Sequence, residues 1–264
     1  MTTPVLLLAI APNWIGAARI PRTLALAGFE VALLTRKDSL AEHSGYVSRL
    51  SLLPAVFTPL QWVFSFAGMV RARPPRIVIP GDDQVWIMLQ TVAELAPEGL
   101  PPDEYARLAA LVRESLGDPE HYHTSTNKTL FPAAAKALGV RMPASALVSN
   151  IQDAESFAMT HGYPVVLKLP YGFGGDGVAI CADRAALTQA LPRLRQCAVA
   201  DLGAGSDTLL AQAYIRGSTT YYGIAAWKGK MLAGYATDKL VGHPEPKGPA
   251  CVIRYHRDPQ IRDF

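Results

Sequence analysis

Continuous apolar runs alternate with helix-like stretches through the first part of the chain. Residues 5–10 and 31–35 are uninterrupted apolar runs, which is typical of parallel strands covered on both faces. Residues 14–27 between them have helical composition, and Gly28 is placed to end that helix. Strand, helix and strand within so short a span predict a right-handed crossover and an open parallel sheet.

A fourth strand is predicted at residues 76–80, after a short strand at 51–53 and a helix at 58–72. It ends in Gly81, Asp82 and Asp83. Carboxylates at the carboxyl end of a parallel strand lie where open sheets bind ligands. Asp83 is also in position to cap a helix over residues 84–94, and we favour that role while keeping ligand binding as the alternative.

A loop at residues 117–124 divides the pattern and predicts a domain boundary. We therefore expect one domain over residues 1–117 and another over residues 118–264. In the second, residues 219–228 and 230–239 read as an antiparallel pair that turns at Gly229. Its other predicted elements are a helix from Ser125 to about Leu138, a strand at 143–149, a helix at 152–161, a helix at 184–196, a strand at 209–215 and a short strand at 252–253.

Residues 163–181 contain the arrangement with the clearest chemistry. A β-type run at residues 164–167 delivers Lys168, a loop follows, and a second β-type run occupies residues 178–181. Glycines allow positive φ and bring backbone N–H groups close to an anion, while a lysine adds a point charge for phosphate oxygens. The pattern predicts a phosphate-binding flap, whose glycines are Gly172, Gly174, Gly175 and Gly177.

The same loop also satisfies the pattern G-x-G-x-x-G, which occurs in dinucleotide-binding folds and in kinases. A dinucleotide fingerprint requires the glycines to open a helix, but the residues after Gly177 read as a strand. A kinase carries its lysine after the loop, in V-A-I-K, whereas this chain has Cys181 there and carries Lys168 before the loop. Context excludes both interpretations.

Composition narrows the remaining classes of protein. A chain of 264 residues with 50% hydrophobic and 18% charged residues can bury a sizeable core. The net charge of +3, without a basic stripe, gives no indication of nucleic acid. Three widely spaced cysteines indicate a reducing cytoplasm, and the short apolar start predicts a buried strand, with no signal peptide and no membrane span.

Taken in order, these pieces resemble the ATP-grasp superfamily over essentially the whole length. The family's first phosphate lysine matches Lys128 in a segment that continues to Gly139-Val140-Arg141-Met142-Pro143, and its second matches Lys168 before the glycine loop. The resemblance implies an α/β protein, with an open parallel-sheet pre-ATP-grasp domain followed by α+β ATP-grasp subdomains: a flap subdomain over about residues 125–211 and the start of a C-terminal subdomain from about residue 212.

The family's hinge strand resembles the segment from Leu210 to Gly217. By that match Gln212 would face the adenine amino group, and Ala213 and Ile215 would supply backbone contacts. The resemblance therefore implies that ATP and Mg²⁺ are the cofactors. The binding residues it implies are Lys128, Lys168, Gly172, Gly174, Gly175, Gly177, Gln212, Ala213, Tyr214 and Ile215.

The activity implied is ligation, in which ATP activates a small-molecule carboxylate as an acylphosphate that an amine attacks; a homodimer is possible.

Two features depart from the family pattern. Ser218-Thr219-Thr220 follows the hinge where members often carry a ribose-binding glutamate, and no E-x-N metal motif occurs by Phe264. The sequence therefore predicts either part of a longer ligase or, as the alternative, a nucleotide-binding or regulatory module without catalysis.

Overall fold

The computed structural model describes residues 2–172, 175, 177–202, 208–243 and 248–256. The chain forms two compact units, Met1–Tyr122 and His123–Phe264.

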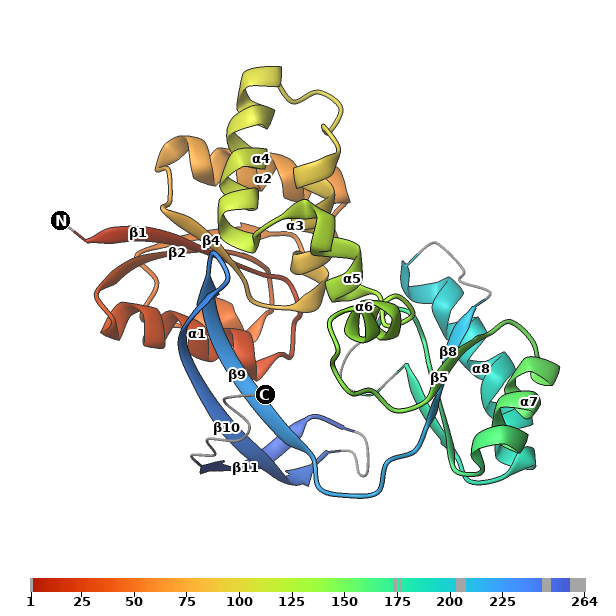
Figure 1. The fold of residues 1–264 in the computed structure, drawn as a ribbon. Coiled ribbons are helices and arrows are strands. Elements are labelled where there is room, and N and C mark those ends of the chain that lie inside the picture. The colour runs from red at the N-terminus through yellow and green to blue at the C-terminus, as the bar shows by residue number, and fades with distance from the viewer. Residues whose placement is uncertain (1, 173–174, 176, 203–207, 244–247, 257–264) are drawn as a thin grey trace. The chain divides into compact units, whose positions relative to one another are not determined.

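The first unit is built on a parallel sheet of the order β3-β2-β1-β4. Helix α1 covers one face of this sheet, and α2, α3 and α4 cover the other (Figure 1). Leu6 and Leu8 of β1 point into the core under α2 to α4, whereas Val5 and Leu7 point toward α1. This alternation explains why β1 is apolar at every position from Val5 to Ala9. The elements are β1 (Thr3–Ala9), α1 (Ile15–Leu26), β2 (Phe29–Arg36), η1 (Leu40–His43), β3 (Arg49–Leu53), α2 (Pro59–Ala72), β4 (Ile77–Pro80), α3 (Asp83–Glu94), α4 (Pro102–Leu116) and η2 (Pro119–His121).

The carboxyl end of β4 is fixed by Asp82, and the predicted cap at Asp83 is wrong. The Asp82 carboxylate accepts from the Val85 backbone N–H at 3.0 Å and so caps α3, of which Asp83 is the first residue. Its other oxygen accepts from the amides of Ile10 and Ala11 at 2.6 and 2.9 Å. One carboxylate therefore caps a helix and holds the loop that follows β1.

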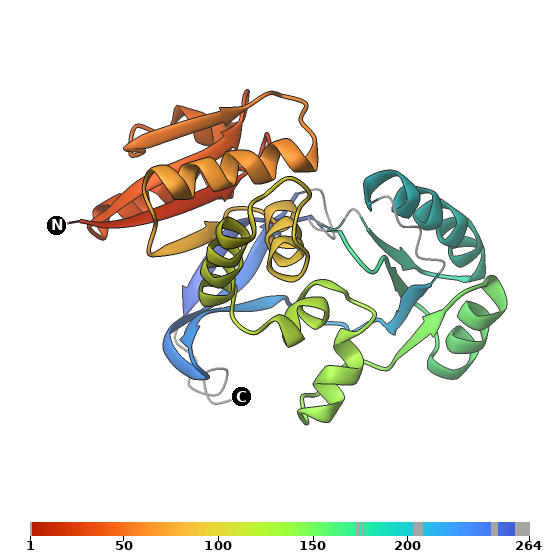
Figure 2. The ribbon, with the colours of Figure 1, turned by 90° about the horizontal axis from the view of Figure 1, so that it is seen from above.

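The second unit contains two antiparallel sheets, with the strand orders β5-β8-β6-β7 and β11-β10-β9. The hairpin of β9 and β10 turns at Gly229 as predicted. Helices α7 and α8 lie side by side on one face of the first sheet (Figures 1 and 2). The elements are α5 (Tyr122–Thr126), α6 (Phe131–Ala137), β5 (Ser145–Val148), α7 (Ile151–His161), β6 (Val165–Lys168), β7 (Val178–Cys181), α8 (Arg184–Leu202), β8 (Leu209–Ala213), β9 (Thr220–Trp227), β10 (Lys230–Gly242) and β11 (Ala250–His256).

The single helix expected from Ser125 to Leu138 is instead two helices, α5 and α6, and Lys128 lies in the turn between them. The Asn127 side-chain oxygen accepts from the Thr129 amide at 2.9 Å and from the Thr129 hydroxyl at 2.6 Å. Such a local side-chain bond offers the backbone an alternative to the helix. Lys128 therefore projects from a turn and not from the face of a helix.

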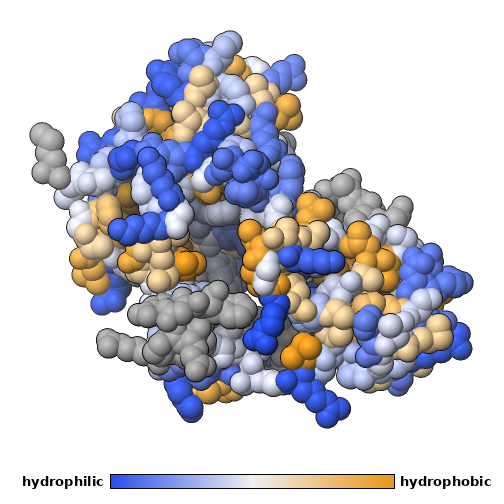
Figure 3. Space-filling model, viewed as in Figure 1, coloured by the Kyte–Doolittle hydropathy of each residue, from blue (hydrophilic) through white to orange (hydrophobic). Residues whose placement is uncertain are grey.

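On the face drawn in Figure 3, hydrophobic residues lie in several separate groups among hydrophilic ones. Within the described part of the chain, none of the helices combines the length and the apolar character needed to cross a membrane.

Candidate functional site

The sheet β5-β8-β6-β7 has one face packed against helices and one face that carries Lys168 and Gln212. Leu167 pairs with Ala211, and both lie in the core that α7 and α8 cover. Because side chains alternate along a strand, Lys168 and Gln212 project from the opposite face. The two strands thus bring together two residues that the sequence singled out separately.

Lys168 donates a hydrogen bond from Nζ to Gln212 Oε1 at 2.6 Å. Gln212 is almost fully buried, with 7% of its surface exposed. Burial lowers the pKa of Lys168 from the ordinary lysine value, because removal from water disfavours the ammonium form. A desolvated cation of this kind binds an anion more strongly than a surface lysine does.

Ser145 completes this group, although the sequence analysis did not select it. Gln212 Nε2 donates to Ser145 Oγ at 3.0 Å, and Ser145 Oγ donates to the Pro143 carbonyl at 2.9 Å. Ser145 is paired with Gln212 in the sheet register. No sequence signal identifies this pairing, since β5 and β8 are far apart along the chain.

The glycine loop follows Lys168 directly and is held at its base by backbone bonds. Leu169 donates to the Gly177 carbonyl at 2.8 Å, and Val178 donates to the Gly175 carbonyl at 3.2 Å. Gly172 and Gly175 have φ values of 115° and 87°, which residues with a Cβ rarely adopt. A Cβ on Gly177 would lie 3.1 Å from Leu169 Cβ. Gly174 lies outside the described residues.

Lys128 lies against the start of this loop. Its backbone amide donates to the Pro170 carbonyl at 2.8 Å, and its Nζ donates to the carbonyl of Gly172. The neighbouring Asn127 donates from Nδ2 to the Tyr171 hydroxyl at 3.4 Å. The structure therefore places Lys128 at the loop that Lys168 begins.

The hinge predicted at residues 210–217 begins within β8 and continues beyond the end of that strand. Strand β8 ends at Ala213, two residues earlier than the strand predicted to residue 215. The Ala213 amide donates to the Ala144 carbonyl at 2.9 Å, and the Tyr214 amide donates to the Pro164 carbonyl at 3.3 Å. Ile215 is 65% exposed, and its amide makes no hydrogen bond to any residue that the structure describes.

Several other charged or ionisable residues of the second unit and the loop before it lie beside local partners. Lys239 Nζ donates to the Gly248 carbonyl at 2.7 Å, and Arg254 lies opposite Asp238 on the paired strands. His121 contacts Glu120 at 3.2 Å. Across the described residues, no three His, Cys, Asp or Glu side chains are grouped closely enough to hold a metal ion.

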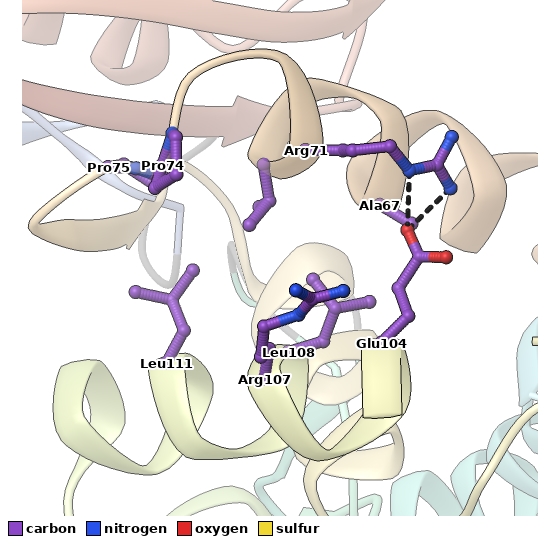
Figure 4. Close-up of a pocket in the computed structure, with 9 residues that line it drawn as sticks. Ala67, Arg71, Pro74, Pro75, Glu104, Arg107, Leu108 and Leu111 are labelled. Atoms are coloured by element: carbon purple, nitrogen blue, oxygen red, sulfur yellow. Dashed lines mark hydrogen bonds and ion pairs between the residues drawn. The ribbon is translucent and has the colours of Figure 1, made fainter. Parts of the chain in front are cut away.

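A cavity of about 320 Å³ lies between α2 and α4 in the first unit (Figure 4). Its lining is mostly apolar, and at one side Arg71 Nε donates to Glu104 Oε1 at 3.0 Å. None of the predicted site residues lines it. The lining residues are Ala67, Val70, Arg71, Pro74, Pro75, Glu104, Arg107, Leu108 and Leu111.

The segment that holds these side chains matches a known family. Residues 127–220 match the model of the carbamoyl-phosphate synthase L chain, ATP-binding domain. These residues are therefore similar to an ATP-binding domain of this family. The family match includes Lys128, Lys168, the glycine loop and Gln212.

Curated relatives match the chain over a short length. The carbamoyl phosphate synthase large chain of Acidobacterium capsulatum is 37% identical over 67 residues, which is 25% of this chain and 6% of that protein. The corresponding chain of a Thermoanaerobacter species is 29% identical over 92 residues, 35% of this chain and 8% of that protein.

Solved ATP-grasp structures share the fold over most of the chain. The biotin carboxylase domain of Hydrogenobacter thermophilus 2-oxoglutarate carboxylase, solved as a dimer with MgADP, ADP and bicarbonate, has a TM-score of 0.64 at 19% identity, covering 90% of this chain and 50% of that one. Biotin carboxylase from Campylobacter jejuni gives 0.63 at 16% identity, with 88% and 51% covered. A solved N5-carboxyaminoimidazole ribonucleotide synthetase gives 0.62 at 12% identity, with 92% and 56% covered. The chain thus spans about half the length of these relatives.

Proposed function

We propose that the second unit binds ATP with Mg²⁺, and that the protein uses it to activate a small-molecule carboxylate as an acylphosphate for attack by an amine. The observation that carries the proposal is the Lys168–Gln212 pair on the face of the sheet away from the helices, beside a glycine loop. This pair lies within the segment that matches an ATP-binding domain.

The chemistry of the donors suits a nucleotide triphosphate. Lys168 and Lys128 supply two ammonium groups near the loop, and the loop amides can cover phosphate oxygens. In this proposal Gln212 and the exposed amide of Ile215 face the adenine base, and Ala213 offers its carbonyl.

Magnesium would be held first by the phosphate oxygens of the nucleotide, since Mg²⁺ commonly binds through substrate phosphates with few protein carboxylates. When bound, it would neutralise charge that develops on the transferred phosphoryl group. The residues of this chain that act beside it are Lys128 and Lys168, which orient the phosphates.

The proposal also includes the substrates, the cellular compartment and the oligomeric state. An acid and an amine of small size are proposed from the family's chemistry, and bicarbonate is the acid found in one solved relative. A reducing cytoplasm is supported by the free thiols of Cys181 and Cys251. A homodimer is proposed, and light scattering of the purified chain tests it.

Titration calorimetry with ATP, with and without Mg²⁺, tests the nucleotide site. Lys168→Ala is expected to weaken ATP binding by about ten- to a hundred-fold, as loss of a charge-assisted bond of about 1.5–3 kcal/mol predicts. Lys136→Ala, on the exposed face of α6, is the matched control and should bind as the wild type does.

Unchanged binding by Lys168→Ala, or no binding by the wild type, would overturn the proposal. Phosphate release in the presence of a panel of carboxylates and amines then separates the ligase from the alternative. Tight ATP binding without phosphate release for any pair of carboxylate and amine would favour a nucleotide-binding module without catalysis.

A further inference from the structure

Three hydrogen bonds in series fix the orientation of the Gln212 amide. Lys168 Nζ donates to Gln212 Oε1 at 2.6 Å, Gln212 Nε2 donates to Ser145 Oγ at 3.0 Å, and Ser145 Oγ donates to the Pro143 carbonyl at 2.9 Å. Each bond has a defined direction. An ammonium group only donates and a backbone carbonyl only accepts. Lys168 and the Pro143 carbonyl, at the two ends of the series, therefore fix which atoms of Gln212 and Ser145 donate and which accept.

The reversed amide would break two of these bonds. It would place the Gln212 NH₂ group against the Lys168 ammonium and set the amide oxygen against a serine whose single hydrogen is already used by Pro143. Gln212 is 7% exposed, so water is poorly placed to compensate for the lost partners. Ser145 therefore holds the amide orientation from one side, and Lys168 holds it from the other.

We propose that Ser145 is a positioning residue that sets the purine selectivity of the nucleotide site. It holds Gln212 Oε1 as an acceptor, and the second lone pair of this oxygen, which Lys168 does not use, receives a hydrogen bond from the 6-amino group of adenine. A guanine base presents an acceptor at that position and meets the same oxygen unfavourably. The inference rests on the proposed function, because it requires a nucleotide in this site.

The test is the ratio of ATP to GTP affinity, measured by calorimetry on the full chain. Ser145→Ala removes the acceptor for Gln212 Nε2, so that Lys168 alone holds the amide and its orientation is less strictly fixed. We expect the ATP-to-GTP ratio to fall by about fivefold, since one buried hydrogen bond contributes on the order of 1 kcal/mol. Ser145→Thr retains the hydroxyl and should restore the ratio.

Two controls separate positioning from general damage to the sheet. Ser149 lies just after the same strand, with its hydroxyl 3.3 Å from that of Thr208, and Ser149→Ala should leave the ratio unchanged. In a Gln212→Glu background both carboxylate oxygens are acceptors and the side chain has no orientation to lose. Ser145→Ala should then have no effect on selectivity.

The outcomes distinguish this inference from the proposed function. A wild type that binds neither nucleotide overturns both. A wild type that prefers ATP, with the same preference in Ser145→Ala, overturns the role of Ser145 alone. An equal loss of ATP and GTP affinity in Ser145→Ala shows a structural role only and also overturns the inference.

Discussion

Lys168 is the single residue on which the proposed chemistry depends most. It ends a buried strand, donates to Gln212 and precedes the glycine loop. Desolvation by the protein lowers its pKa below the ordinary lysine value of 10.5. The same burial that strengthens its attraction to a phosphate therefore makes its charge easier to remove.

The lowered pKa of Lys168 predicts a pH dependence of both stability and binding. Between the folded pKa and the unfolded value, the unfolded chain binds more protons, so this residue makes stability rise as pH increases through that interval. ATP affinity should fall over the same interval, because a neutral amine no longer attracts phosphate. Calorimetry from pH 7 upward on the wild type measures this loss.

Lys168→Arg provides the comparison, because arginine stays charged throughout the range. Its ATP affinity should lack the decline that the wild type shows. If ATP affinity declined with pH equally in the wild type and in Lys168→Arg, titration of Lys168 would not be the cause of the decline.

At the scale of single elements, Asp82 joins helix α3 to the loop after β1. Its carboxylate accepts three backbone hydrogen bonds, from Ile10, Ala11 and Val85. Asp82→Ala should destabilise the chain by roughly 2–4 kcal/mol, since it removes a helix cap and two further bonds to a charged acceptor. Asp83→Ala should cost at most about 1 kcal/mol.

Urea unfolding followed by tryptophan fluorescence measures both variants, and the fully buried Trp62 reports on this unit. Equal losses for Asp82→Ala and Asp83→Ala would contradict the assignment of the cap.

The elements that the sequence predicted well are those set by local interactions. Apolar runs located the four parallel strands, and Gly229 was recognised as the hairpin turn. Asn127 broke a predicted helix because its side chain competes for the backbone. That competition depends on a rotamer, which composition does not reveal.

The candidate site was predictable only in part. Lys168 and the glycine loop are adjacent in sequence, so their association needed no knowledge of the fold. The contacts of Gln212 with Lys168 and Ser145 depend on the strand order β5-β8-β6, which places strands distant in sequence beside one another. A nonlocal register of this kind is set by tertiary packing.

At the scale of the whole molecule, the chain combines an open parallel-sheet unit with a second unit that carries every described residue of the proposed nucleotide site. Each unit has its own hydrophobic core. The family match at residues 127–220 lies entirely in the second unit. Nucleotide is therefore expected to bind to the second unit, a location that an affinity measurement alone does not test.

Hydrogen exchange of the full chain, with and without ATP and Mg²⁺, tests that claim most directly. Protection by nucleotide is expected in three segments of the second unit: the turn at Lys128, the segment from β6 to β7, and the end of β8 with Ile215. Protection confined to residues 2–122, or no protection under conditions where calorimetry shows binding, would contradict the account.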